Sequence, residues 1–436
     1  MAIDYRISGD ELTPGGVDVE QAVMFAKEIQ DKLDIIHVSA GNLYHPVSLS
    51  YMIQSSYLPM ATNVRFAKRF REELHIPVTT VGSFNLDLAE KAVSDGSADV
   101  VAMIRQFIAD PDCVNKARDG RGDEIRPCIR CCICTGSDPH GCPTPLRCSV
   151  NPPSGRNPRF DEIPPLKEAK KVVIVGGGAG GMEAARRLSE RGANVILFEK
   201  EDRLGGSLIL AGANPIKGDV ARYADWSVQM TERLENVEIR LSSEATPEAV
   251  KAENPDAVIV AVGSDQIVPE IPGISGDNVM LAVDVDMGTK KPGKKVVLVG
   301  AGLTGTETAV TLARQGHEVT LIDMLSIDEI DSRGNSSRSC TSMLRRMAEE
   351  AGVETITGLR LTEVRDDGIF ARDESGKNVF LPCDSVVLSM GVRARSQLAG
   401  SFDGTAKTVI KIGDCVRRGG NILTAVLDGF YAAMNI

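Results

Sequence analysis

Cysteines are concentrated in one short stretch of this chain. Six of its ten cysteines lie in CIRCCICTGSDPHGCPTPLRC, residues 128–148. Cys128, Cys131 and Cys134 follow a C-x2-C-x2-C pattern, which can bring three thiolates from one tight loop to three corners of an iron–sulfur cube. Cys148, separated from Cys134 by 13 residues, could close such a site. The spacing therefore predicts a [4Fe–4S] cluster held by these four residues.

Other uses of these thiols stay open. A structural zinc site more often uses two separated C-x2-C pairs, whereas this segment has one such grouping, and ordinary free thiols are a third alternative. Cys132 is the rival of Cys134 for the third ligand position, and Cys142, in a turn-rich stretch, is expected to be a bystander. The remaining cysteines stand alone and are expected to be small buried apolar residues: Cys113, Cys340, Cys383 and Cys415.

A glycine-rich turn in the middle of the chain could hold a dinucleotide. In KKVVIVGGGAGGMEAARRLSERGANVILFEK, residues 170–200, an apolar strand leads into G-x-G-x-x-G and a helix. Gly176 permits the tight turn, Gly178 lets the backbone approach a pyrophosphate, and Gly181 lets helix and strand pack closely. The helix N-terminus would bind phosphates, and Glu199 would accept hydrogen bonds from the adenosine ribose. A βαβ unit with accidental glycines is the alternative.

The same parts recur in KKVVLVGAGLTGTETAVTLARQGHEVTLID, residues 294–323. The glycines are here Gly300, Gly302 and Gly305, and the acidic residue is Asp323. An acid at this position suits the free 2′-hydroxyl of NAD, whereas NADP needs a cation near its 2′-phosphate. The following stretch, MLSIDEID, offers no cation, so NADH is expected in preference to NADPH.

Short strands alternating with helices must position these motifs. DIIHVSA, IPVTTVG and ADVVAMI are apolar runs rich in β-branched residues, and they are expected to be buried parallel strands. VDVEQAVMFAKEIQDK and LDLAEKAVSDG have helical periodicity, and the second ends at Gly96. This βα repetition predicts an α/β layer or barrel. Five prolines between residues 151 and 171 indicate a surface linker.

Composition argues against several classes of partner. The net charge is −11 with both signs mixed along the chain, so neither nucleic acid nor an anionic membrane is expected. We find no apolar run long enough for a transmembrane helix and no secretory signal in MAIDYRISGDEL, so a cytoplasmic protein is expected. Clustered cysteines in such a protein indicate metal or redox chemistry.

The order of motifs after residue 170 resembles that of flavoproteins with two dinucleotide-binding domains, such as the disulfide reductase-like enzymes. The first βαβ unit is followed by RLGGSL, DAVIVAVG and, near the C-terminus, VIKIGDCV. The resemblance implies FAD in the first unit and NADH in the second, hence hydride transfer between them. It also places further residues at the flavin, with the aspartate on the ribityl chain: Gly205, Gly206, Gly263, Gly413 and Asp414.

The chain as a whole resembles the iron–sulfur flavoenzymes of the old yellow enzyme superfamily, including 2,4-dienoyl-CoA reductase, 2-enoate and enone reductases of anaerobes, and trimethylamine dehydrogenase. The resemblance rests on the βα repetition, the cysteine segment ending in CSVNP, and the two nucleotide motifs in this order. It implies FMN in a TIM (β/α)8 barrel beside the cluster. Electrons would pass from NADH through FAD, the cluster and FMN to an activated C=C bond of a small enoyl-CoA, enoate or enone.

The resemblance also assigns residues of the barrel. YRIS, residues 5–8, matches an Arg-x-Ser strand, so Arg6 would lie near the FMN ring, where a cation stabilises the reduced flavin. VTTVGSF and AMIRQFIADPD match the FMN phosphate loops after strands seven and eight, which places Gly82 and Arg105 at the phosphate. Gly82 stands where the dienoyl-CoA reductases have an arginine.

A histidine is expected at the substrate. AGNLYH matches the family's Gly-x-Gly-x-His stretch after strand six, with Leu43 in place of the second glycine. His45 would then polarise the substrate or transfer a proton, with Tyr44 as a weaker candidate, and a plain surface-loop histidine is the alternative. His37, inside a strand, is expected only to fill its local packing.

The barrel is expected to be incomplete. A (β/α)8 barrel needs roughly 200–250 residues, whereas 127 precede Cys128. YRIS aligns with strand five, so the resemblance implies that strands one to four and the proton-donating tyrosine are missing. The chain would be N-terminally truncated, or a second chain would complete the barrel; a homo-oligomer is a further option. Two other functions stay open: an NADH-dependent diaphorase, and a non-catalytic subunit that binds a partner chain.

The expected fold class is therefore α/β, with the C-terminal half of a TIM barrel, an iron–sulfur loop and two Rossmann-like domains. The expected regions are the half-barrel (1–127), the cluster segment (128–150), a linker (151–169), the FAD domain (170–280 and 400–436) and the NAD domain (281–399).

Overall fold

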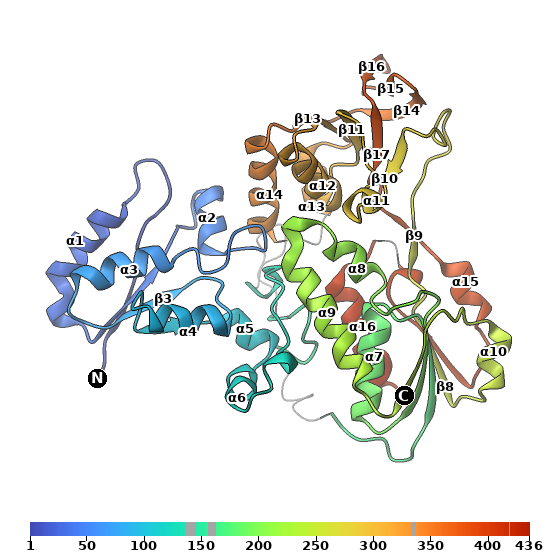
Figure 1. The fold of residues 1–436 in the computed structure, drawn as a ribbon, viewed down its shortest axis with the longest axis horizontal. Coiled ribbons are helices and arrows are strands. Elements are labelled where there is room, and N and C mark those ends of the chain that lie inside the picture. The colour runs from blue at the N-terminus through green and yellow to red at the C-terminus, as the bar shows by residue number, and fades with distance from the viewer. Residues whose placement is uncertain (136–144, 156–162, 334–336, 418) are drawn as a thin grey trace. The chain divides into compact units, whose positions relative to one another are not determined.

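The computed structural model describes residues 1–135, 145–155, 163–333, 337–417 and 419–436 (Figure 1). Contacts within the chain divide it into two compact units. The first consists of Met1–Thr144 and Ser336–Met347, and the second of Pro145–Asn335 and Ala348–Ile436.

The first unit is built on a parallel sheet of four strands in chain order. Its strands are β1 (Asp4–Ser8), β2 (Ile35–Ser39), β3 (Val78–Val81) and β4 (Val100–Ala102). Its helices are α1 (Val19–Ile29), α2 (Pro46–Met52), α3 (Val64–Glu73), α4 (Leu86–Ser94), α5 (Ile104–Ala109) and α6 (Cys113–Arg118), with short 3-10 turns at Gln30–Lys32, Gly122–Glu124 and Ile133–Thr135. Each strand is thus followed by helix, as the βα repetition predicts.

The two faces of β1 and β2 differ in burial. Ile36 and Val38 of β2 point toward α1 and α3, where they join a core with Phe66 and Phe70. Alternate residues of a strand point to opposite faces, and those on the other face of β1 and β2 are exposed or half-buried. The sequence run DIIHVSA therefore forms the expected parallel strand, but it is buried on one face rather than on both.

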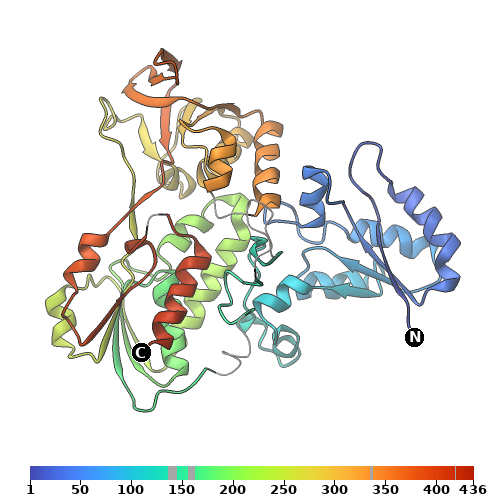
Figure 2. The ribbon, with the colours of Figure 1, turned by 180° about the vertical axis from the view of Figure 1, so that it is seen from behind.

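The second unit contains two parallel sheets of five strands. The first has the order β19-β8-β5-β6-β7. Its strands are β5 (Lys171–Val175), β6 (Asn194–Phe198), β7 (Val237–Arg240), β8 (Ala257–Val260) and β19 (Thr408–Lys411). Its helical segments are α7 (Ala179–Glu190), α8 (Ser207–Gly212), η4 (Pro215–Lys217), α9 (Gly218–Glu232), α10 (Pro247–Ala252), α15 (Ser396–Ser401), η5 (Gly413–Cys415) and α16 (Ile422–Met434). Helices α7 and α16 pack side by side (Figures 1 and 2).

The second of these sheets has the order β10-β17-β11-β12-β13. Its strands are β10 (Val279–Leu281), β11 (Lys295–Val299), β12 (Glu318–Ile322), β13 (Glu354–Ile356) and β17 (Ser385–Leu388). Its helices are α11 (Ala282–Asp286), α12 (Leu303–Arg314) and α13 (Ile327–Arg333). Helix α14 (Arg338–Glu350) follows in the chain, and its residues up to Met347 belong to the first unit. Two antiparallel elements complete the unit: the sheet of β14 (Arg360–Arg365), β15 (Gly368–Arg372) and β16 (Asn378–Pro382), and the pair of β9 (Ser264–Gln266) with β18 (Val392–Ala394).

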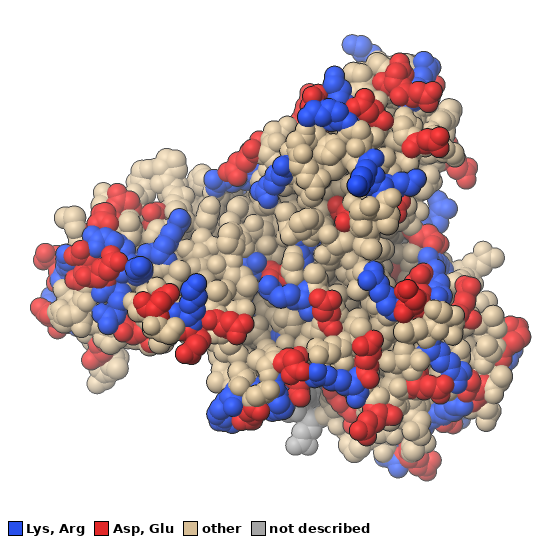
Figure 3. All heavy atoms as spheres, viewed as in Figure 1, with Lys and Arg blue, Asp and Glu red and all other residues tan. Residues whose placement is uncertain are grey.

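The predicted fold class is confirmed: βα repeats come first, and two Rossmann-like sheets follow. Figure 3 shows acidic and basic side chains interspersed over the visible face, in keeping with the mixed charge of the sequence. Within the described residues, we find no helix with the length and apolarity needed to cross a membrane.

Candidate cofactor-binding sites

The two glycine-rich turns have nearly the same backbone geometry. The first glycine of each has a positive φ, +104° at Gly176 and +109° at Gly300. The third glycine of each lies directly against that turn, because a Cβ at Gly181 or Gly305 would lie 1.9 Å from the carbonyl oxygen of Gly176 or Gly300. No side chain fits at such a distance, so both turns require glycine at these positions.

The second glycine of each turn faces open space. Gly178 is the N-cap of α7 and Gly302 is the N-cap of α12, and a Cβ at either would meet no atom within 4 Å. Backbone N–H groups at the start of each helix therefore remain approachable. This is the arrangement that lets a helix N-terminus bind phosphate groups.

The acidic residues after the second strands hold the turns. Glu199 Oε2 accepts the N–H of Gly177 at 2.8 Å, and Asp323 Oδ2 accepts the N–H of Ala301 at 2.8 Å. A carboxylate has about four acceptor positions, so each acid keeps acceptor capacity for a ribose hydroxyl.

A cavity of about 700 Å³ opens beside the first turn. Its volume lies in the range of small-molecule and cofactor sites. Most of the residues predicted at the flavin line it, although they come from four separate parts of the chain: Gly176, Gly178, Glu199, Gly206, Gly263, Gly413 and Asp414. Glycines leave room for a cofactor backbone along this wall, so the cavity fits a dinucleotide such as FAD.

Gly205 and Asp414 have different relations to this cavity. Gly205 stands behind the wall, where its N–H donates to the carbonyl oxygen of Gly177 at 2.9 Å. Asp414 lines the cavity, and its Oδ1 accepts the N–H of Gly420 at 3.0 Å. Asp414 Oδ2 lies 3.5 Å from the Ser264 hydroxyl. Because this contact is long, the oxygen can still accept a hydrogen bond from a sugar hydroxyl.

A buried polar cluster joins the segment after α8 to helices α11 and α12. Lys217 Nζ and Glu307 Oε2 are 2.6 Å apart, and both side chains are buried. Asn214 donates to Asp286 at 2.9 Å, and Thr308 donates to the same carboxylate at 3.0 Å. Burial raises the pKa of Asp286 to about 6, although both of these hydrogen bonds act to lower it. The sequence motifs did not reveal this cluster, because its members come from segments without a shared pattern.

The predicted FMN phosphate residues lie together in the first unit. Gly82 has a φ of +135°, and a Cβ there would lie 2.8 Å from Asn63 Nδ2. The Arg105 guanidinium donates to the Ser83 hydroxyl and to the Gln54 carbonyl oxygen. A glycine turn beside a buried arginine suits a phosphate group, and Ser83 is a further residue of this loop that the sequence prediction missed.

Arg6 and His37 are neighbours across β1 and β2. Their Cα atoms pair in the sheet register, so both side chains point to the face that lacks helices. Burial, followed by the charge of Arg6, lowers the pKa of His37, and its Nε2 is buried without a hydrogen-bond partner. The expectation that His37 only fills its local packing stays a prediction, and the register with Arg6 shows which face of the sheet its side chain occupies.

His45 and Tyr44 follow the carboxyl end of β2. This is the edge at which barrel enzymes build active sites. His45 is the N-cap of α2, and its Nδ1 is buried without a hydrogen-bond partner, whereas the Tyr44 side chain is 97% exposed. His45 thus has a free polar atom at this edge.

Cysteines of the first unit gather around Arg105. Cys132 Sγ lies 3.2 Å from Arg105 Nη1. Burial acts to lower the pKa of Arg105, but the nearby charges of Cys132, Cys128, Cys134 and Cys131 outweigh burial and raise it. A cation among cysteines favours their thiolate forms, which metal binding requires.

Cys132 is enclosed by protein groups. Its side chain is 1% exposed, and its sulfur lies 3.4 Å from the Arg130 carbonyl oxygen and 3.5 Å from that of Gln54. A hydrogen bond with Cys340 lowers the pKa of Cys132, against burial and together with the charge of Arg105. The four lone cysteines are buried as expected: Cys113, Cys340, Cys383 and Cys415.

The remaining cysteines differ in position. Arg130 donates its N–H to Cys128 Sγ at 3.4 Å, a contact of the kind that surrounds cluster ligands. Cys148 is buried and belongs to the second unit, and Cys142 lies outside the described residues. In the described part of the chain, no group of three or more His, Cys, Asp or Glu side chains converges on one metal-ion position.

Comparison with known families decides the classification. Residues 170–414 match the family model described as pyridine nucleotide-disulphide oxidoreductase. The chain belongs to that family. Residues 1–124 match the NADH:flavin oxidoreductase / NADH oxidase family. The predicted membership of the old yellow enzyme superfamily is confirmed, and the expected cofactors are those of these families and their relatives: FMN, FAD, NADH and [4Fe–4S].

Individual relatives match over nearly the whole chain. An NADH oxidase of Thermoanaerobacter brockii is 37% identical over 442 residues, which cover 100% of this chain and 66% of the relative. A bilirubin reductase of Mediterraneibacter gnavus is 34% identical, with 99% and 67% covered. A structure of 2-naphthoyl-CoA reductase superimposes with a TM-score of 0.86 at 28% identity, covering 99% of this chain and 64% of that one. The chain thus spans about two thirds of the length of these relatives.

Proposed function

We propose that this chain is the NADH-oxidising and electron-relaying part of a reductase of activated C=C bonds. The second glycine turn would bind NADH, the cavity beside the first would bind FAD, and the cysteine segment would hold a [4Fe–4S] cluster. When bound, FAD accepts a hydride and gives up its electrons singly, as transfer to such a cluster requires. An enoyl-CoA, an enoate or an enone would be the final acceptor.

The observation that carries the proposal is the pair of matched turns within one unit. Each has a glycine that cannot carry a Cβ, a glycine that faces open space, and an acid that holds the turn. A nicotinamide site and a flavin site are the two halves of an NADH-dependent flavoenzyme. The names of a bilirubin reductase and a 2-naphthoyl-CoA reductase among the relatives support the reductive direction.

The chain's own residues would divide the work among three sites. The open backbone at Gly178 and Gly302 would bind the two pyrophosphates, while Asp414 would fix the ribityl chain. Cys128, Cys131, Cys134 and Cys148 would ligate the cluster. The enclosure of Cys132 by protein groups supports Cys134 as the third ligand.

The half-barrel would contribute the substrate side. Arg6, Gly82 and Arg105 would hold FMN, and His45, with Tyr44 less favoured, would act on the substrate. Among the described strands, β1 and β4 have no further neighbour in the sheet. Four more βα units, from the same polypeptide or from a second chain, would close the barrel over Arg6 and His37.

Cofactor content tests the proposal. The chain would be purified without oxygen, supplied with iron, sulfide, FAD and FMN, and desalted; bound flavins would be separated and iron counted. FAD, FMN and about four irons per chain, with reduction of a C=C acceptor such as an enoate, would support the full reductase. A chain that retains neither flavin would overturn the proposal.

A diaphorase is the second candidate, favoured because both glycine turns and the cavity lie within the second unit. In that case the same preparation would retain FAD and iron but no FMN. NADH would then reduce a one-electron dye and would not reduce the C=C acceptor.

A further inference from the structure

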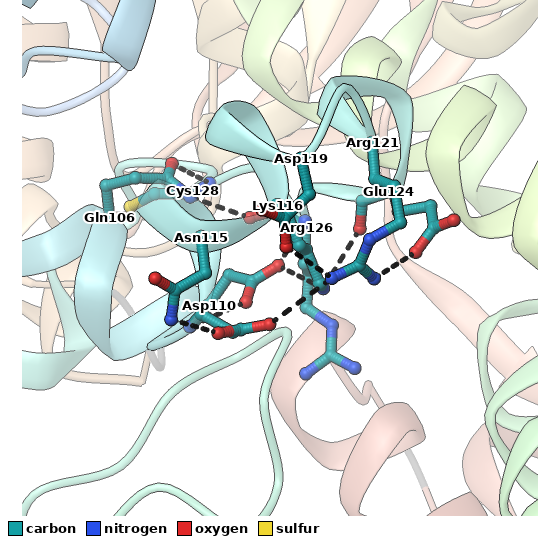
Figure 4. Close-up of polar contacts among 10 residues, drawn as sticks. Gln106, Asp110, Asn115, Lys116, Asp119, Arg121, Glu124, Arg126 and Cys128 are labelled. Atoms are coloured by element: carbon teal, nitrogen blue, oxygen red, sulfur yellow. Dashed lines mark hydrogen bonds and ion pairs between the residues drawn. The ribbon is translucent and has the colours of Figure 1, made fainter.

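A short helix connects the predicted phosphate loop with the predicted cluster segment. Helix α5 (Ile104–Ala109) carries Arg105, which contacts Ser83 of the glycine loop and Cys132. The next residue along the helix, Gln106, is 7% exposed and points toward Cys128 (Figure 4). Neighbouring side chains of one helix thus reach both regions.

Gln106 uses both ends of its amide on the backbone that leads into the cysteines. Its Nε2 donates to the carbonyl oxygen of Arg126 at 2.9 Å, and its Oε1 accepts the N–H of Cys128 at 3.2 Å. The residue between them is Pro127, whose ring fixes φ and which has no N–H to satisfy. One side chain therefore holds the backbone on both sides of a rigid residue.

Asp110 continues the same pattern four residues later. Its Oδ2 accepts the N–H of Arg126 at 2.9 Å and pairs with Lys116 Nζ at 2.8 Å, while the aspartate is 4% exposed. Lys116 also donates to the carbonyl oxygen of Glu124 at 3.2 Å. Asp110 is the C-cap of α5. Gln106 and Asp110 together bind the segment that begins the cysteine motif (Figure 4).

We infer that Gln106 is a positioning residue for the iron–sulfur cluster, because it sets the backbone of Cys128 before the thiolate meets iron. The inference rests on the proposed function, in which Cys128 is a ligand. The Cys128 N–H is directed to Gln106, while its sulfur accepts the N–H of Arg130 at 3.4 Å, so the main chain and the side chain of Cys128 are held independently. Asp110 supports this arrangement, because it accepts the N–H of Arg126.

The test compares two glutamine substitutions of the same kind. Gln106→Leu keeps the volume but removes both bonds. Gln30→Leu is the matched control, because Gln30 also donates to a carbonyl oxygen (Lys27, 3.3 Å) and accepts a backbone N–H (His75, 3.1 Å). Gln106→Glu is a second variant, since it keeps an acceptor for Cys128 but loses the donor to Arg126.

Loss of iron to an excess of chelator is the first readout. Partners that orient metal ligands typically change metal retention by about tenfold or more, so Gln106→Leu should lose iron about tenfold faster than wild type, and Gln106→Glu should fall between them. Gln30→Leu should behave as wild type. Bound FAD and the thermal midpoint, followed in every variant, report whether the chain is still folded.

The second readout is electron paramagnetic resonance of the oxidised protein. A cluster that loses the Cys128 thiolate is left with three cysteine ligands, so Gln106→Leu should show part of the three-iron signal that Cys128→Ala shows in full. General loosening of the fold would lower the iron content without producing this signal. If Gln106→Leu matches Gln30→Leu in both readouts while Cys128→Ala shows the signal, this inference fails alone. If wild type binds no cluster, or Cys128→Ala keeps all its iron, the proposed function fails as well.

Discussion

Within the second unit, the two βαβ motifs that contain the glycine turns have nearly the same backbone geometry but different surroundings. In both, the strands pair over five positions, from Lys171 opposite Asn194 and from Lys295 opposite Glu318. A Cβ at the third glycine of either motif would lie 1.9 Å from the carbonyl oxygen of the first glycine. The turn is therefore a shared device, dictated by local backbone geometry.

The difference lies in what the rest of the chain adds. Around the first turn, segments near Gly206, Gly263 and Asp414 enclose a cavity of about 700 Å³. After the second turn the acid is a shorter Asp323, followed by Met324, which is 46% exposed. The motif thus predicts that a dinucleotide binds, whereas segments remote from the motif determine which one.

The largest effect should come from the third glycines. Gly181→Ala forces a Cβ against a backbone oxygen, and such overpacking typically costs about 1–3 kcal/mol. We expect the thermal midpoint to fall and FAD to be lost on gel filtration. Gly305→Ala should destabilise the second turn by a similar amount, but it should leave FAD bound and raise the KM for NADH. Equal loss of FAD from both variants would remove the distinction between the turns.

The second glycines should separate binding from folding. A Cβ at Gly178 or Gly302 meets no protein atom within 4 Å, so alanine should leave the thermal midpoint of the cofactor-free protein unchanged. The methyl group would instead occupy the space through which the pyrophosphate approaches the backbone. We therefore expect Gly178→Ala to lower the affinity for FAD about thirtyfold (about 2 kcal/mol). Gly302→Ala should lower the affinity for NADH by a similar factor. Equilibrium dialysis measures the first, and KM the second. An unchanged FAD affinity in Gly178→Ala would argue against the first turn as the flavin site.

The acid of the second turn should control the choice of nicotinamide nucleotide. Replacing Asp323 by serine and Met324 by arginine removes a negative charge and supplies a cation for the 2′-phosphate. The ratio of kcat/KM for NADPH to that for NADH should rise about tenfold, which corresponds to about 1.4 kcal/mol. Glu199→Ser, the matched change in the first turn, should leave this ratio unaltered and lower the FAD content instead. A shift of the ratio by Glu199→Ser would reverse the assignment.

The smallest effect concerns the polar cluster beside α12. The folded protein raises the pKa of Asp286 from 3.8 to about 6, so the native state binds a proton more readily than the unfolded state. Stability from this group is therefore present below about pH 4 and is lost as pH rises through 6. One pKa unit corresponds to about 1.4 kcal/mol, and because the carboxyl is only partly buried we expect a loss of about 1 kcal/mol. Asp286→Asn should flatten the decline of the unfolding free energy between pH 4 and 7; an unchanged slope would contradict the shift.

Residues fixed by local backbone geometry could be predicted from the sequence. Gly176, Gly181 and Glu199 lie within one βαβ unit, where strand, turn and helix lengths leave little freedom. Asp414, far along the chain, could be predicted only through the family resemblance. Its place at the cavity depends on β19 returning beside β8, which no local pattern announces.

Other residues escaped prediction for physical reasons. Gln106 and Asp110 act through hydrogen bonds to backbone, which any polar side chain could make and which have no periodic signature. The Lys217–Glu307 pair depends on packing between separate segments. The face of the sheet on which His37 lies follows from the register of β2 with β1, which the apolar pattern of the strand does not indicate.

Anaerobic titration of the reconstituted chain with NADH tests whether electrons pass from NADH through the flavin to the cluster. Flavin absorbance and the paramagnetic signal of a reduced cluster would be followed in the same samples. We expect NADH to bleach the flavin and the cluster signal to grow afterwards, and we expect Gly302→Ala to lose both changes at low NADH. A flavin that stays oxidised with NADH, although dithionite reduces it, would contradict the account.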